Sequence, residues 1–366
     1  MAGDSRVQRP SVADLRARSE RPGAPGRRRR AGRSRWQRAW RWVLAGLAAV
    51  LVLVAVYYVG LVAYVDSTVE RVDVLRLAGP EILAEQRQLD AENFLLVGSD
   101  GGGRDTTILA HLSPDGSQSV VVVFPRDAYV DVPACQAAGG QPTEPYSGPF
   151  SSVIGAGGAA CLVHTVQVLT GLRVNHYVQM DLASFPAMVD ALGGVPLCLG
   201  SSLRERDSGL ELPAGTSVID GEQTLPFLRL ETRQGPAETE RIQRQQQFLA
   251  SLLDRSLSPG TLVNPLRLTR FLTTTADSLT LDLDTTLGDL KSLVELLRDL
   301  NGELVLLLTA PIAVPDFSPV GSSASYPLLD EQLGRQLYES IIEDAAVGLP
   351  GAAAADPSSP GEVDCG

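Results

Sequence analysis

Three apolar segments in the middle of the chain decide its fold class: NFLLVG at residues 93–98, TTILAHL at 106–112 and SVVVVF at 119–124. Each is short, and Gly-rich or Pro-Asp-Gly sequences separate them, which is typical of strands joined by turns. We expect the second and third segments to form a hairpin around residues 114–117. The sequence therefore predicts a sheet at the centre of the folded region.

Helical periodicity alternates with further strands on the C-terminal side of this sheet. Gly171 is placed to cap the end of one predicted helix, and Asp181 can cap the start of another, which stops at Gly193 and Gly194. A mixture of strands and helices indicates an α/β or α+β sandwich. The remaining predicted helices are 157–170, 238–257, 287–300 and 329–346, and the remaining predicted strands are 177–180, 195–199 and 303–309.

A membrane-spanning segment precedes the strands. The sequence VLAGLAAVLVLVAVYYVGLVAYV at residues 43–65 contains 23 residues without a charge. At about 1.5 Å rise per residue a helix of this length crosses a bilayer core of roughly 30 Å. A cleaved signal peptide would have a shorter apolar stretch nearer the N-terminus, so we interpret the segment as a retained anchor.

The charges are divided between the two sides of this anchor. Thirteen arginines and three acidic residues give residues 1–41 a charge of +10, and the rest of the chain carries -22. The positive-inside rule then predicts a cytoplasmic N-terminus and an extracytoplasmic region after Asp66. Orientation and attraction to anionic membrane lipid account for the arginines, so we expect no nucleic-acid partner.

Five segments follow from these patterns. We expect residues 1–41 to be a disordered, basic cytoplasmic segment and residues 42–65 to be a transmembrane helix. Residues 66–90 are predicted to form a helical connector, residues 91–346 the folded extracytoplasmic domain, and residues 347–366 a flexible C-terminal tail.

All four cysteines fall on the predicted outer side, where an oxidising environment permits disulfides. Their even number suits two bridges, and their spacing fits no zinc motif. We interpret them as structural; they are Cys135, Cys161, Cys198 and Cys365.

Carboxylates and arginines at three places suggest phosphoryl chemistry. Asp100 and Asp105 lie on one Gly-rich loop and together suit a magnesium ion, although a solvated Asp-Gly turn is the simpler alternative. Arg126 follows a strand and can bind phosphate oxygens, while Asp127 can orient the arginine or accept a proton. A surface ion pair is the simpler alternative for Arg126 and Asp127. An Arg-rich helix contributes the third place, and a solvated helix face is its alternative; its residues are Arg229, Arg233, Arg241 and Gln245.

The histidines carry no chemistry in this interpretation. His111, His164 and His176 are isolated on apolar segments and are predicted to be packing residues. No Ser-His-Asp arrangement is evident.

Seven ordered motifs resemble the LytR-CpsA-Psr family of cell-wall glycopolymer transferases, actinobacterial type. The similarity runs from about residue 90 to 255 and more weakly to about 346. The motifs are NFLLVGSD (93–100), DTTILAH (105–111), FPRDAYVDVP (124–133), LTGLRVNHYV (169–178), MVDALGGV (188–195), LPAGTSVIDGEQ (212–223) and ERIQRQQ (240–246).

The resemblance implies an α-β-α sandwich with a mixed central β-sheet and a long apolar cleft for a polyprenyl tail. It implies that Asp100 and Asp105 bind Mg²⁺ (or Mn²⁺), that Asp127, Arg126 and Arg241 are catalytic, and that Cys135 pairs with Cys161. Cys198 with Cys365 is the remaining pair. The implied pyrophosphate-binding residues are Arg104, Arg126, Arg229, Arg233, Arg241 and Gln245.

The implied reaction is attack by a peptidoglycan sugar hydroxyl on a polyprenyl-pyrophosphate-linked glycan donor at the membrane. It forms a phosphodiester, and a pyrophosphatase side activity would accompany it. Three departures from the family pattern remove cations: Arg104 is displaced by one residue, Glu231 replaces an arginine, and residues 149–152 contain no lysine. They leave open the alternative of a non-catalytic binding or regulatory paralogue that holds the lipid-linked glycan.

Overall fold

The computed structural model describes residues 33–99, 105–114, 119–136, 141–200, 202–204, 209–229, 237–298 and 305–345. The chain divides into two compact units, Met1–Gly60 and Leu61–Gly366. The described part of the first unit belongs to helix α2 (Arg33–Thr68).

Helix α2 is long and apolar enough to cross a membrane. The candidate membrane span is Arg38–Thr68, and no residue of its most apolar 18-residue stretch is buried. Helix α3 (Ser152–Thr170) passes the same test of length and composition, but half of that window is buried. Because Leu162, Val163 and Val166 of α3 pack in the main hydrophobic core, we assign it as a core helix.

The second unit is built on a mixed seven-stranded sheet in the order β1-β12-β7-β2-β3-β4-β13. The central strands β2, β3 and β4 are antiparallel neighbours, whereas β7 runs parallel to β2 and β13 parallel to β4. The strands are β1 (Glu70–Val72), β2 (Glu92–Ser99), β3 (Thr106–Leu112), β4 (Ser119–Phe124), β7 (His176–Asp181), β12 (Leu279–Asp282) and β13 (Val305–Thr309).

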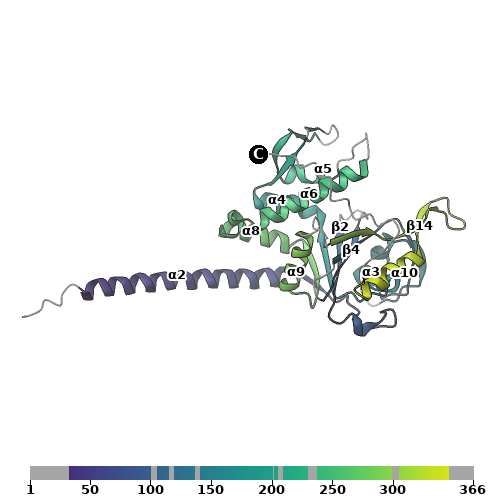
Figure 1. Cartoon of the computed structure of the whole chain (residues 1–366), viewed down its shortest axis with the longest axis horizontal. Coiled ribbons are helices and arrows are strands. Elements are labelled where there is room, and N and C mark those ends of the chain that lie inside the picture. Colours follow the sequence, from purple (N-terminus) through teal and green to yellow (C-terminus); the bar gives the residue numbers. More distant parts are fainter. Residues whose placement is uncertain are drawn as a thin grey trace, which may run out of the picture. The chain divides into compact units, whose positions relative to one another are not determined.

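Helices cover both faces of this sheet (Figure 1). Leu95 and Tyr177 point to one face, where they pack with helices α3 and α10 (Glu331–Ile342). Side chains alternate along a strand, so Phe94 and His176 point to the opposite face. Asp289 of helix α9 (Leu287–Arg298) lies beside His176 on that face. The second unit is therefore an α-β-α sandwich.

A second hydrophobic core lies apart from the sheet. Phe227 and Phe248 meet there with ring centroids 6.1 Å apart, and both are almost fully buried. The elements that supply this core are α4 (Phe185–Leu192), β8 (Val195–Leu199), β11 (Gly215–Ile219), α5 (Gly221–Arg229) and α6 (Ala237–Leu257).

Shorter elements complete the described chain. A four-stranded sheet has the order β14-β15-β5-β6, and β9 pairs with β10. The bounds are β5 (Tyr129–Val132), β6 (Tyr146–Pro149), β9 (Leu203–Arg204), β10 (Glu211–Leu212), β14 (Ile312–Phe317), β15 (Tyr326–Leu329), η1 (Glu85–Arg87), η2 (Leu182–Ser184), α7 (Pro259–Leu262) and α8 (Pro265–Ala276).

The predicted fold class is confirmed, with an α-β-α sandwich around a mixed sheet and one N-terminal apolar helix. The antiparallel pairing of β3 with β4 is also confirmed. Gly171 and Gly193 end α3 and α4 in the left-handed conformation that glycine adopts without strain.

The predicted helical connector over 66–90 is wrong. Helix α2 ends at Thr68, and the chain then enters the central sheet as β1, which pairs with β12. The strand ERV is too short to show a period in the sequence, so its pairing with a distant segment decides its conformation. The helix predicted to begin at residue 329 begins two residues later, because Leu329 belongs to β15. Helix α10 begins after Asp330, whose side chain accepts hydrogen bonds from the backbone of the first turn.

Candidate functional site

The candidate site lies at one edge of the central sheet, where β2 and β4 end and β3 begins. Gly98 of β2 pairs with Thr106 of β3, and Thr107 pairs with Phe124 of β4. This register brings Asp105, just before β3, and Arg126, just after β4, to the same edge. Two of the three places that the sequence suggested are therefore close in the fold.

Asp105 has a buried carboxylate oxygen without a partner among the described residues. Its Oδ1 atom is buried and makes no hydrogen bond within the described part of the chain. Burial and, after it, the negative charge of Asp105 raise the pKa of the Tyr177 hydroxyl, which donates a hydrogen bond to Oε1 of Gln179 at 2.7 Å. A buried, unpaired carboxylate oxygen is costly, so it suits a cation ligand. Asp105 thus fits the expected magnesium ion, which takes one or two carboxylates with phosphate oxygens and water.

Arg126 and Asp127 form an exposed ion pair on the turn after β4. Nε of Arg126 lies 3.3 Å from Oδ1 of Asp127, and the side chains are 45% and 59% exposed. The turn is fixed by its backbone, because the amide of Ala128 donates to the carbonyl of Pro125 and the amide of Ser151 donates to the carbonyl of Arg126. Both charged groups are therefore accessible to a ligand, and the backbone that carries them is held by hydrogen bonds.

The bond from Ser151 also places this turn beside the start of α3. Ser151 is the N-cap residue of α3, and its side chain makes no capping hydrogen bond. The first backbone N–H groups of a helix attract anions. The turn that carries Arg126 therefore adjoins the start of α3.

The other predicted site residues are described in part or not at all. Arg229 ends α5, and Arg241 and Gln245 lie on α6, but only their backbone is described. Phe248 and Leu252, later on α6, are buried. The residues outside the description are Asp100, Arg104, Glu231 and Arg233.

The first predicted disulfide is present. Cys135 and Cys161 are bonded, with Cα atoms 5.3 Å apart, and join the segment after β5 to the middle of α3. Cys198 is also disulfide-bonded, and Cys365 lies outside the described residues.

Two histidines are packing residues, as the sequence predicted, and the third also belongs to a cluster of polar side chains. His111 is buried and hydrogen-bonded to Asn93 at 2.8 Å, and burial lowers its pKa. His164 is mostly buried near Glu81. His176 stacks on Phe94 but also lies within 4.8 Å of two carboxylates, a cluster that the sequence gave no sign of.

Comparisons with known proteins agree with this architecture. The LytR_cpsA_psr family model matches residues 63–326, which is most of the chain and includes Asp105, Arg126 and the start of α3. This chain belongs to the LytR-CpsA-Psr family. The match confirms the resemblance that the seven motifs indicated.

Relatives within the family are named for cell-wall assembly. A probable cell wall biosynthesis protein, LcpB of Corynebacterium glutamicum, is 33% identical over 255 residues, which are 66% of this chain and 58% of that protein. The polyisoprenyl-teichoic acid–peptidoglycan teichoic acid transferase TagU of Oceanobacillus iheyensis is 28% identical over 236 residues, 61% of this chain and 71% of that protein. The chain therefore spans about half the length of the corynebacterial relatives it matches, 58% of LcpB and 46% of LcpA.

A solved structure supports the fold. The structure described as TagT bound to LI-WTA superposes with a TM-score of 0.50 and 20% sequence identity, over 75% of this chain and 99% of that one. At this identity the similarity shows the fold alone.

Proposed function

We propose that this chain is a cell-wall glycopolymer transferase that moves a glycan from a polyprenyl-pyrophosphate carrier onto peptidoglycan. The observation that carries the proposal is the buried Oδ1 of Asp105, unpaired within the described residues, at the same sheet edge as the exposed guanidinium of Arg126. A cation ligand beside an anion-binding group is what phosphoryl transfer requires, because catalysis there is mainly positioning and charge neutralisation. Membership of the family supports the same chemistry.

In the proposed reaction a sugar hydroxyl of peptidoglycan attacks the phosphorus that carries the glycan. A new P–O bond joins glycan and acceptor through a phosphodiester, and the bond to the bridging oxygen breaks. Polyprenyl phosphate leaves with that electron pair. Water in place of the sugar hydroxyl would give the pyrophosphatase side activity.

The described residues have separate parts in this step. Arg126 donates hydrogen bonds to the pyrophosphate oxygens, and the N-terminus of α3 favours the same negative charge. Asp105, with Asp100, would hold Mg²⁺, which when bound neutralises charge on the pyrophosphate. Arg229, Arg241 and Gln245 complete the anion site in this proposal, together with Arg104 and Arg233.

Asp127 is the proposed acceptor of the hydroxyl proton. It is well exposed, and its Oδ1 contacts Arg126, so its carboxylate lies beside the group that binds the phosphate. The same contact allows a second role, in which Asp127 only orients Arg126. Asp127→Asn discriminates the two roles: transfer at the wild-type rate with unchanged donor affinity would exclude Asp127 as the base.

The anchor places the site near its substrates. Helix α2 holds the chain in the membrane that contains a polyprenyl carrier, and the Arg-rich flank favours a cytoplasmic N-terminus. The family domain would then face the peptidoglycan. Protease added to intact cells is expected to cleave after Asp66, and protection of that region would contradict this orientation.

Transfer is tested with the purified full-length protein in detergent. The substrates are a synthetic polyprenyl-pyrophosphate sugar and a peptidoglycan fragment, with and without Mg²⁺. We expect polyprenyl phosphate and a phosphodiester-linked product, lost in Asp105→Asn and Arg126→Ala. Tight binding of the donor without turnover would instead identify a binding paralogue and overturn the transferase proposal.

A further inference from the structure

A second cluster of chemically active side chains lies at the opposite end of the central sheet from Asp105. Glu92 is the first residue of β2, and His176 is the first residue of β7. These strands are parallel, with Phe94 paired to His176, so their amino ends meet. Strand β2 extends from Glu92 to Ser99, which corresponds to about 23 Å at roughly 3.3 Å per residue. The cluster is therefore separate from the proposed pyrophosphate edge.

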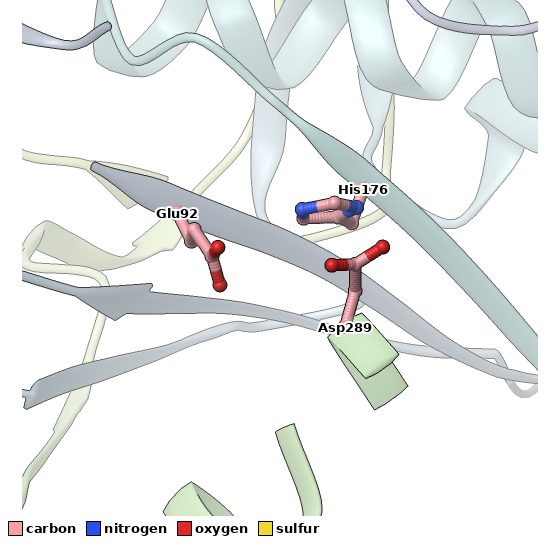
Figure 2. A group of neighbouring side chains, drawn as sticks. All are labelled: Glu92, His176 and Asp289. Carbon is pink, nitrogen blue, oxygen red and sulfur yellow. The ribbon is translucent and has the colours of Figure 1, made fainter. Parts of the chain in front are cut away.

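Three side chains from three elements converge there (Figure 2). One ligand atom from each of Glu92, His176 and Asp289 lies within 4.8 Å of the other two, and all three residues are half-buried. Glu92 and His176 share the sheet face opposite the main core, and Asp289 reaches them from the first turn of α9. The three residues are far apart in sequence and are brought together only by the fold.

The hydrogen bonds of His176 fix which nitrogen is available. Nδ1 of His176 lies 2.8 Å from Oγ1 of Thr285. The Thr285 hydroxyl donates its hydrogen to Oδ2 of Asp282, so its oxygen accepts from Nδ1–H. The neutral imidazole then carries its lone pair on Nε2. A partner on the second ring nitrogen that fixes tautomer and orientation is the usual arrangement of metal-binding histidines.

The surroundings hold the ring in place. His176 stacks on Phe94, with centroids 4.4 Å apart and an interplanar angle of 21°. Asp282 is fully buried, and its Oδ2 also accepts the backbone N–H of Tyr177 at 2.8 Å. The imidazole is therefore oriented before any ligand arrives, which reduces the cost of binding.

Structural roles explain part of this cluster but not all of it. Oδ2 of Asp289 accepts hydrogen bonds from the backbone and hydroxyl of Thr286, both at 2.7 Å, which is a helix-capping role. That role occupies one carboxylate oxygen. The Glu92 side chain makes no hydrogen bond or ion pair within the described residues, yet it lies close to a second carboxylate. Two carboxylates this close repel unless a positive charge lies between them.

We propose that Glu92, His176 and Asp289 bind a divalent transition-metal ion, Zn²⁺ by preference, and that this ion ties α9 to the central sheet. One imidazole nitrogen and two carboxylate oxygens are a zinc ligand set, with a fourth position open to water. Magnesium rarely takes imidazole, so the site differs in preference from the Asp105 edge. Ligand atoms around tetrahedral zinc lie about 3.3 Å apart, so the three side chains need to close by about 1.5 Å or less.

The direct test is calorimetric titration of metal-free, untagged full-length protein in detergent with ZnCl₂. We expect one equivalent to bind and the thermal unfolding temperature to rise, because the ion binds only the folded state. Glu92→Gln and Asp289→Asn are each expected to weaken the affinity by about tenfold or more. Asp284→Asn changes an exposed acid on the same loop and is expected to bind zinc as wild type does.

Two further measurements keep the outcome unambiguous. Thermal unfolding without metal checks that Glu92→Gln is folded, since its side chain has no structural partner within the described chain. Asp105→Asn removes the other candidate cation ligand, and this variant is expected to bind the same single equivalent of zinc with unchanged affinity. The proposal is overturned if zinc does not bind, or if Glu92→Gln and Asp289→Asn bind it with wild-type affinity. The metal-site proposal does not depend on transferase activity, because the zinc titration measures binding alone.

Discussion

Asp105 and Arg126 lie at the same edge of the central sheet because Thr107, two residues after the aspartate, pairs with Phe124, two residues before the arginine. The two charged groups differ in exposure: Oδ1 of Asp105 is buried without a hydrogen-bond partner in the described residues, and the Arg126 side chain is 45% exposed. Because of this difference, substitutions of the two residues are expected to change activity and stability in different ways.

Arg126→Ala is expected to reduce transfer by about 10- to 100-fold, because it removes charge-assisted hydrogen bonds to phosphate worth about 1.5–3 kcal/mol. Stability should hardly change, since the exposed pair with Asp127 contributes little. The steady-state rate of polyprenyl phosphate release and the thermal unfolding temperature measure the two effects. Arg87→Ala is the matched control, because Arg87 is an exposed arginine paired with Glu343. Equal losses in both variants would remove Arg126 from the site.

Asp105→Asn is expected to abolish metal-dependent transfer while leaving stability unchanged or slightly higher. The substitution removes a charge that is partly desolvated, and no ion pair of Asp105 within the described residues is lost with it. A loss of activity without a loss of stability is typical of a functional group that is strained for its role. Activity as a function of Mg²⁺ concentration, together with thermal unfolding, checks both parts. A large drop in unfolding temperature would show that Asp105 is structural.

The sequence predicted the strands of the sheet well, since 93–98, 106–112 and 119–124 have apolar patterns and turn residues at their ends. It also singled out Asp105 and Arg126, because each follows or precedes a strand in a turn-rich context. It could not locate the cluster of Glu92, His176 and Asp289. Each of these residues has an ordinary local context, and only the parallel pairing of β2 with β7 and the packing of α9 bring them together.

The conformation of short elements was predicted wrongly for a related physical reason. A strand of three residues, such as β1, has no measurable period, and its conformation depends on hydrogen bonds to β12 more than 200 residues later. Long-range pairing therefore overrode the helical interpretation of residues 66–90.

Removal of the Cys135–Cys161 disulfide is expected to lower the free energy of unfolding by about 3 kcal/mol, because the bridge closes a loop with a sequence separation of 26. The double variant Cys135→Ala/Cys161→Ala avoids a free thiol. Denaturant unfolding with and without a reducing agent measures the effect. Comparing oxidised wild type with the variant isolates this bridge, and identical midpoints would show that it does not stabilise the fold.

Stability is expected to fall as the pH drops below about 6.5. Burial lowers the pKa of His111 and of His164 from 6.5, and the positive charge of Arg76 lowers the pKa of His164 further. Below 6.5 the unfolded chain binds protons that the folded chain does not, so the free energy of unfolding decreases with falling pH and is insensitive to these groups above that value. Thermal unfolding between pH 7.5 and 5.5, about one unit on either side of the unfolded pKa, should show the loss.

His164→Gln tests the share of one histidine in this pH dependence. The variant is expected to show a smaller loss between those two pH values than wild type does. Asp289 responds in a different pH range: burial raises the pKa of its carboxyl, but hydrogen bonds from Thr286, the charge of His176 and a bond from its own backbone together bring that pKa below the usual value. That carboxylate therefore contributes stability that is lost only at more acidic pH. An unchanged profile in His164→Gln would show that His164 is not the cause.

Asp282→Asn is expected to destabilise the protein by about 2 to 4 kcal/mol, because it leaves buried donors without acceptors. The carboxylate of Asp282 accepts the backbone N–H groups of Asp284 and Thr285 through Oδ1, and that of Tyr177 and the Thr285 hydroxyl through Oδ2. An amide in the same place presents its own N–H₂ to one of these pairs of donors. Asp284→Asn, at an exposed position two residues later, should change the unfolding free energy by less than about 0.5 kcal/mol. Equal stability of the two variants in denaturant unfolding would mean that the buried carboxylate does not stabilise the fold.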